Sequence, residues 1–109
     1  MPVVPDPTAP SFEIDGNTLR VRGELGVDEE KAFEQALREL LATNHAALVI
    51  DLASVRYASS GYVRHIAMTI MDAKQKNRSV TVRASRRIAR LLQIGGVDRL
   101  APVELVNGP

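Results

Sequence analysis

An apolar run that leads into two serines and a glycine constrains this chain more than any other feature. Residues 47–52 are almost entirely apolar, as expected for a strand buried on both faces. After the serines and glycine at 59–61, here called the serine turn, apolar residues recur at helical spacing up to about residue 77. The sequence therefore predicts a strand, a turn and a helix. Two hydroxyl groups then precede a helix N-terminus, where free N–H groups and the positive end of the dipole suit a phosphate.

The length and composition limit the domain organisation, the metal chemistry and the cellular location expected of this chain. At 109 residues, 45% of them hydrophobic, the chain has the size of one domain with its own core. It contains no cysteine, so disulfides and thiolate metal sites are excluded. No apolar run approaches the ~18 residues of a membrane span, and the N-terminus lacks a signal-peptide pattern. We therefore expect a cytoplasmic protein without membrane insertion.

Charge is divided unevenly between the two halves of the chain. Residues 1–55 hold ten acidic and four basic residues, a net charge of −6. Residues 56–109 hold three acidic and ten basic residues, a net charge of +7. Such an imbalance bears on the surfaces that partners recognise rather than on the fold.

The N-terminal part of the sequence predicts a tail, a hairpin and a helix. Prolines at 2, 5, 7 and 10 favour a polyproline-like or disordered tail over 1–11, which leaves 12–109 as a single domain. Alternating residues on either side of a turn at 15–17 predict a β-hairpin up to about residue 25. Asp28 is the expected N-cap of a helix that ends near residue 44.

The remaining elements complete an α/β pattern. A strand over 79–83 follows the helix after the serine turn, then Ser85 caps a helix that two glycines end, and a short strand closes the chain. The order ββαβαβαβ predicts an α/β fold, a mixed central β-sheet with helices largely on one face. The strand at 47–52 should lie between those at 19–25 and 79–83, with neither of its faces wet.

Catalysis by the serine turn has little support in the sequence. A nucleophilic serine needs a base, and the only histidines are His45 and His65. No Gly-x-Ser-x-Gly elbow or phosphate-binding glycine loop accompanies Ser59 or Ser60. The two histidines lack metal-ligand spacing, so no metal site or cofactor is expected. We expect a protein that is not an enzyme.

Two further groups of residues suggest partner surfaces. Arg86, Arg87 and Arg90 share one exposed helical face. Nucleic acid is one interpretation, but the chain has four aromatic residues and no recognised nucleic-acid module, so an acidic partner is favoured. Met68 and Met71 lie beside the apolar stripe of the preceding helix, either as part of the core or as an adaptable docking patch.

Several motifs resemble those of STAS domains in the anti-sigma factor antagonist family. Residues 49–52 (VIDL) and 57–61 (YASSG) are similar to the family's strand ending in Asp-Leu and its Asp-Ser-Ser/Thr-Gly turn. Residues 23–25 (GEL) and 91–100 (LLQIGGVDRL) agree with the family's hairpin end and its closing leucine-rich helix and turn. The resemblance extends over about 12–106, and the order and spacing of the motifs are specific.

The resemblance implies a non-catalytic regulator that switches partners. In the family, a serine/threonine kinase that is itself the anti-sigma factor phosphorylates the first serine of the turn, which corresponds here to Ser59, with Ser60 as the alternative. The unphosphorylated protein binds this kinase so that sigma factor is released, and phosphorylation ends the binding. We expect docking on the outer side of the helix that the serine turn opens. The expected docking residues are Ser59, Ser60, Gly61, Tyr62, Arg64, His65 and Met68.

Some positions depart from the family pattern. Ala58 and Gly26 replace aspartates that lie near the kinase-facing surface in the family, and Arg64 and His65 replace small or aliphatic residues. The loss of the aspartates favours a second hypothesis, a phosphorylation-independent STAS subunit of a transporter or a larger signalling complex. The serine turn itself favours the phosphorylated regulator. The sequence leaves the oligomeric state open, a dimer included.

Overall fold

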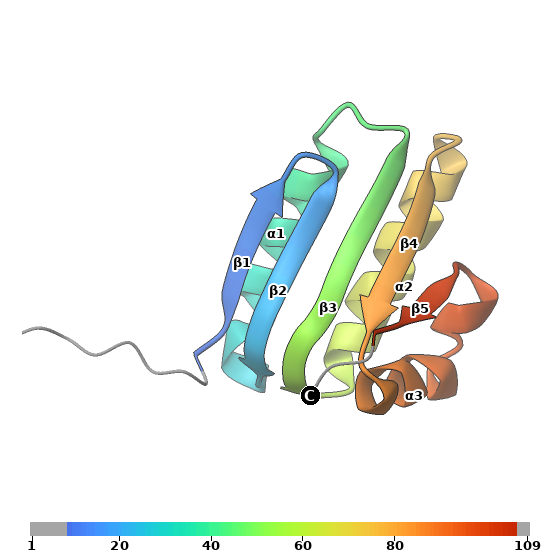
Figure 1. The fold of residues 1–109 in the computed structure, drawn as a ribbon. Helices are drawn as coiled ribbons and strands as arrows, with labels where there is room; N and C mark the ends of the chain where they lie inside the picture. The colour runs from blue at the N-terminus through green and yellow to red at the C-terminus, as the bar shows by residue number, and fades with distance from the viewer. Residues whose placement is uncertain (1–8, 107–109) are drawn as a thin grey trace, which may run out of the picture.

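The computed structural model describes residues 9–106, in which a five-stranded sheet carries three α-helices (Figure 1). The strands are β1 (Ser11–Asp15), β2 (Thr18–Leu25), β3 (Ala47–Ala58), β4 (Ser79–Ala84) and β5 (Val103–Leu105). The helices are α1 (Glu30–Leu41), α2 (Gly61–Gln75) and α3 (Arg86–Ile94), with short 3-10 turns η1 (Val27–Glu29) and η2 (Val97–Arg99). Most of the tail predicted over 1–11 lies outside the described residues, and Ser11 already belongs to β1.

The strands are ordered β1-β2-β3-β4-β5 across the sheet. β1 and β2 pair antiparallel as a hairpin, whereas β2, β3, β4 and β5 pair parallel. α1, α2 and α3 connect the parallel strands in turn. The predicted α/β fold with a mixed central sheet is confirmed, and so is the position of β3 between β2 and β4.

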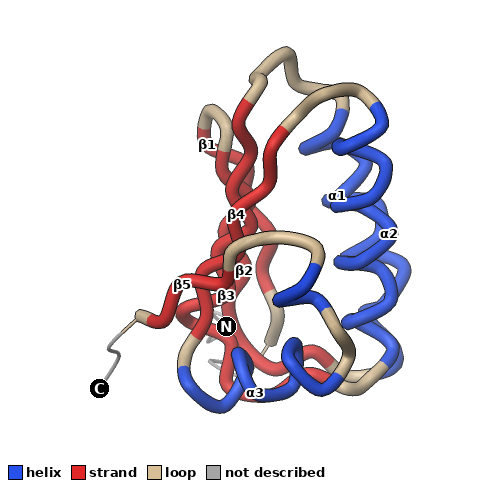
Figure 2. The backbone as a smooth tube through the Cα atoms, turned by 90° about the vertical axis from the view of Figure 1, so that its right-hand side faces the viewer, coloured by secondary structure: helices blue, strands red, loops and turns tan. Residues whose placement is uncertain are grey.

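The helices cover one side of the sheet, as predicted. Figure 2 shows α1 and α2 side by side on that side, while α3 lies nearer to the carboxyl ends of the strands. Leu48, Ile50 and Leu52 of β3 point into this layer and are buried. They pack in one core with Ile66 and Ile70 of α2. No helix in residues 9–106 is long and apolar enough to cross a membrane.

The prediction that neither face of the central strand is wet is wrong. On the side away from the helices, β3 carries the half-buried Val49 and Ala53 and the charged Asp51. Figure 1 views this open face of the sheet. Asp51 itself is only 7% exposed, but its partners Arg20 and Arg83 are partly exposed, and an apolar helix on this face would desolvate their charges.

A row of alternating charges crosses the open face of the sheet. Directly opposed residues on successive strands are Glu13, Arg20, Asp51, Arg83 and Glu104. Asp51 Oδ2 accepts a hydrogen bond from Arg83 Nη1 at 3.3 Å and lies 3.9 Å from Arg20 Nε. Opposed residues share one face of a sheet, so each charge in the row meets an opposite one.

The central strand is longer than predicted, since β3 continues past Leu52 to Ala58. Its pairing with β2 persists to the last pair, Leu25 with Ala58, through two register shifts. The added length carries the chain beyond the end of β4 before the serine turn begins. It therefore sets the turn at the carboxyl edge of the sheet.

One predicted helix cap is wrong and another is confirmed. Asp28 does not cap a helix, because residues 27–29 form η1 and α1 begins at Glu30 without a side-chain cap. Ser85 does cap α3, since its Oγ accepts a hydrogen bond from the Ile88 N–H at 3.4 Å. Gly96, at φ 81°, adopts the left-handed conformation that favours glycine just after α3 ends.

Candidate functional site

The serine turn joins the end of β3 to the start of α2, at the carboxyl edge of the sheet. Ser60 is exposed and Ser59 is half-buried. Neither hydroxyl group makes a hydrogen bond to another residue within 9–106, and Ser60 does not cap α2 through its side chain. Among the residues that the structure describes, both hydroxyl groups thus lack a hydrogen-bond partner.

Three contacts hold this turn against the segment that links β2 to α1. The Ser59 N–H donates to the Leu25 carbonyl at 3.0 Å. The Tyr62 hydroxyl donates to the Gly26 carbonyl. One turn further along α2, His65 Nε2 lies 2.8 Å from Glu30 Oε1. The site is thus built from two loops, and residues 26–30 form its second wall.

Tyr62 is not on the outer side of α2, which corrects one of the expected docking positions. Its side chain is 1% exposed, and its ring centroid lies 5.0 Å from that of Phe33 at an interplanar angle of 58°. Burial, assisted by the carboxylates of Glu29, Glu30 and Asp28, raises the pKa of Tyr62 to about 12. Tyr62 is therefore a neutral hydrogen-bond donor that anchors the second wall.

His65 is also largely withdrawn from the surface, since its side chain is 14% exposed and is paired with Glu30. The same carboxylate crowds the turn, because a Cβ added at Gly61 would lie 2.8 Å from Glu30 Oε1. A glycine at position 61 lets Glu30 approach the first residue of α2. The helix N-terminus that was expected to suit a phosphate therefore also has a carboxylate beside it.

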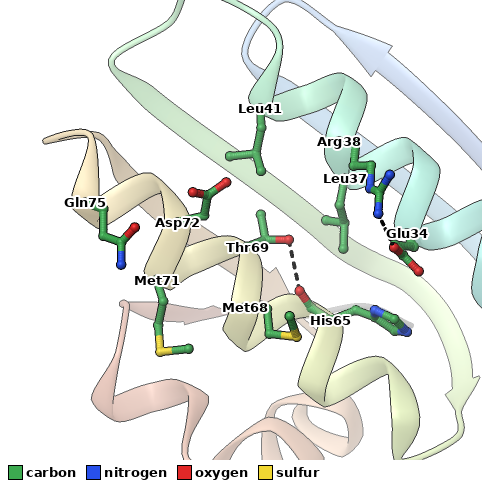
Figure 3. A pocket seen from close by; sticks show the side chains of 10 residues that line it. All are labelled: Glu34, Leu37, Arg38, Leu41, His65, Met68, Thr69, Met71, Asp72 and Gln75. Atoms are coloured by element: carbon green, nitrogen blue, oxygen red, sulfur yellow. Dashed lines mark hydrogen bonds and ion pairs between the residues drawn. The ribbon is translucent and has the colours of Figure 1, made fainter.

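The other expected docking residues are at least partly exposed. Gly61 is half-buried, and Arg64 is exposed. Met68 is 57% exposed, and with Met71 it borders a groove of about 400 Å³ between α1 and α2 (Figure 3). The two methionines thus belong to the surface rather than to the core. The serine turn, Arg64 and Met68 follow one another along the outside of α2.

The histidines cannot act together. His45 precedes β3 and His65 follows it in α2, so the twelve-residue strand separates them. At ~3.3 Å per residue the strand is roughly 36 Å long, and the two histidines lie near its opposite ends. Within residues 9–106, no group of three or more histidine or acidic side chains is arranged to hold a metal ion.

Sequence reasoning missed the second wall of the site. Nothing in the sequence pairs Glu30 with His65, which are 35 positions apart. The burial of Tyr62 did leave a signal, because Tyr62 and Ile66 stand at i and i+4 on the apolar stripe of α2. Extending the stripe by one residue toward the turn would have placed Tyr62 in the core.

The fold and the position of the serine turn are those of one protein family. The chain belongs to the STAS family, since the family model described as "Mlab, STAS domain" matches residues 10–106. The resemblance found in the sequence is thereby confirmed. No curated protein matches the chain.

The solved structures that are similar to this chain include two bacterial proteins. One is an anti-sigma factor antagonist from Mycobacterium paratuberculosis, with 26% identity and a TM-score of 0.77 over 90% of this chain and 86% of that one. The other is SiaC of Pseudomonas aeruginosa, with 20% identity and a TM-score of 0.68 over 95% of this chain and 94% of that one. The chain therefore has the fold of an anti-sigma factor antagonist.

Proposed function

We propose that the chain is a non-catalytic antagonist of an anti-sigma factor. It binds a partner of the serine/threonine kinase type through the serine turn and the outer side of α2, and phosphorylation of Ser59 ends the binding. The observation that carries this proposal is the place of Ser59, just before α2 in the fold of an anti-sigma factor antagonist, with no hydrogen bond from its hydroxyl group to another residue within 9–106. The chain then regulates transcription through protein contacts alone.

The switch is a phosphoryl transfer that the partner catalyses. Ser59 Oγ bonds to the γ-phosphorus of ATP while the bond to the β-γ bridging oxygen breaks. ADP leaves, and the hydroxyl proton passes to a base of the partner. Within the described residues, neither serine is hydrogen-bonded to His65, which pairs with Glu30 instead. The lack of a serine–histidine hydrogen bond supports a role as substrate rather than as enzyme.

The surroundings of Ser59 bear on how the domain tolerates a phosphate. The start of α2 offers the positive end of a helix dipole, which favours the added charge of about −1.5 to −2. The Glu30 carboxylate beside Gly61 opposes it. Arg64 is exposed one turn into α2 and can turn toward the phosphate. We expect the fold to survive and the cost of the phosphate to fall on the docked partner.

A second candidate is a phosphorylation-independent subunit of a larger assembly, a transporter complex included. Ala58 and Gly26 in place of the family's aspartates favour it, and the Glu30 carboxylate at the turn opposes an added phosphate. In this case the serine turn is a docking surface without chemistry.

Phosphate mapping separates the two candidates. The protein is used to capture its partner from the source cells, and the purified pair is incubated with magnesium and ATP. Mass spectrometry should find one phosphate on Ser59. Ser59→Ala should abolish it, whereas Ser60→Ala should keep it. A partner that binds but leaves both serines unmodified would favour the assembly subunit.

A further inference from the structure

α3 and the start of α2 lie next to the end of β3 (Figure 1), and residues of these elements line an apolar surface. Two shallow pockets of about 300 and 360 Å³ share Leu91 and Ile94, which stand between them. Ile94 is 78% exposed, and Tyr57 at the edge of the first pocket is 54% exposed. The α2–α3 surface, as we call it, consists of Tyr57, Ala58, Leu91, Ile94, Arg64, Arg87 and Arg90.

Arginines border this apolar centre on both sides. Arg87 and Arg90 line the first pocket and Arg64 lines the second. All three are exposed, and none forms an ion pair within the described residues. No acidic residue lines either pocket. The surface therefore combines unneutralised positive charge with exposed apolar side chains.

The charge pattern of α3 is unfavourable for the isolated domain. Arg86 and Arg87 occupy the first two positions of the helix, and its first turn contains no acidic residue. Positive charge at a helix N-terminus opposes the macrodipole and destabilises the helix. Residues that destabilise their own element without a compensating contact occur most often at functional sites. The arginine positions thus point to a ligand that neutralises them.

We propose that the α2–α3 surface binds an acidic amphipathic segment of the partner protein. Its apolar side chains fill the pockets beside Leu91 and Ile94, and its carboxylates contact Arg64, Arg87 and Arg90. A protein segment fits better than a nucleic acid or a membrane, because the charges surround two apolar hollows rather than forming a continuous basic stripe. This inference rests on the proposed function in that it names the chemistry of that same partner.

The position of this surface also relates it to the switch. Ser60 and Arg64 line the same pocket, and Ser59 is the neighbouring residue. A phosphate on Ser59 would therefore bring negative charge to the place where the carboxylates of the segment dock. Repulsion of the segment, together with competition for Arg64, weakens the complex.

The chemistry is tested with a synthetic helix of about fifteen residues that carries leucine on one face and glutamate on the other. The control peptide has glutamine in place of each glutamate. Titrated into isotope-labelled full-length protein, the acidic peptide should shift the amide NMR signals of α3 and of the end of β3. The glutamine peptide should bind at least about tenfold more weakly. Equal binding of the two peptides, or no shift at this surface, would overturn the proposal.

Variants of α3 supply a matched comparison. Arg87→Glu with Arg90→Glu should weaken acidic-peptide binding by about tenfold or more, and Ile94→Ser should weaken it as well. Arg86→Glu is the control, because Arg86 lies on the same helix but lines neither pocket. It should leave binding unchanged. Arg86→Glu and the double variant should both raise the Tm, since each adds negative charge to the first turn. An equal loss of binding in Arg86→Glu would indicate that only the overall positive charge of α3 attracts the peptide, and it would refute the proposal.

Two other probes and the captured partner complete the test. A short DNA duplex or an anionic phosphatidylglycerol vesicle that binds this surface more tightly than the peptide would overturn the choice of a protein segment. With the captured partner, the Arg87 and Arg90 variant tests docking and Ser59→Asp tests the switch. Loss of partner binding in the Arg87 and Arg90 variant alone would support the docking surface and reject the proposed phosphorylation switch. Loss of partner binding in Ser59→Asp alone would support the switch and reject the docking surface.

Discussion

At the scale of single residues, Tyr62 holds the start of α2, next to the serine turn, against α1 and the segment that precedes it. Its ring packs against Phe33 of α1, and its hydroxyl group donates to the Gly26 carbonyl. One side chain therefore ties α2 both to α1 and to the second wall of the site. Phe12 of β1 extends the aromatic contact, with ring centroids of Phe12 and Phe33 6.0 Å apart.

Tyr62→Phe should destabilise the domain in a way that depends on pH. At neutral pH the lost hydrogen bond costs about 1 kcal/mol. Because the pKa of Tyr62 is raised from 10.0 to about 12, the folded protein favours the neutral phenol. Its contribution is complete below pH 10 and is lost as the pH rises through 12. Urea denaturation at several pH values should show the parent losing more stability than Tyr62→Phe across this range. An equal loss in both would contradict the assignment.

At the scale of elements, the contact between α2 and α3 is close. A Cβ added at Gly95, just after α3, would overlap Cγ1 of Val63 in the first turn of α2. Val63 is buried and branched, so it has little freedom to move aside. Gly95 thereby sets the distance across the second pocket of the α2–α3 surface.

Gly95→Ala should therefore cost about 1–3 kcal/mol of unfolding free energy. Val63→Ala in the same chain should recover part of that loss, which thermal or urea denaturation of both single variants and the double variant would reveal. Gly26→Ala is the matched control, because its Cβ would meet only the flexible end of Glu29. Strict additivity of the Gly95 and Val63 changes would argue against the overlap.

The elements also show where sequence patterns are sufficient. Helical spacing predicted the stripe of α2, and Ser85 predicted the cap of α3, because both are local features. The extension of β3 to Ala58 was not predictable in this way. It depends on pairing with β2 through two register shifts, and pairing across the sheet is not a local property. The contact between Glu30 and His65 was missed for the same reason.

At the scale of the whole molecule, the sheet has one dry and one wet side. The apolar run of β3 suggested two dry faces, but Arg20 and Arg83 stand beside Asp51 and compensate its charge on the open side. Their positions opposite Asp51 could not be known before the register was known. The fold class was predictable from element order, whereas the exposure of this face was not.

Acidic residues of the first half of the chain and basic residues of the second half lie close to the serine turn. Asp28, Glu29 and Glu30 lie in the segment held against the turn, and Arg87 and Arg90 lie on α3. The sequence predicted the imbalance and the basic face of α3. It did not predict that acidic and basic segments would both adjoin one turn.

Affinity for the captured partner tests the central claim most directly. The parent, Ser59→Ala, Ser59→Asp and Ser79→Asp are compared by calorimetry, with circular dichroism to verify the fold. Ser79 is an exposed serine at the start of β4, so its variant adds the same charge away from the serine turn.

We expect Ser59→Asp to bind at least about tenfold more weakly than the parent, because a charge in a desolvated interface opposes docking. Ser59→Ala and Ser79→Asp should bind like the parent. Parent-like affinity in a folded Ser59→Asp protein would contradict the account of a switch at Ser59.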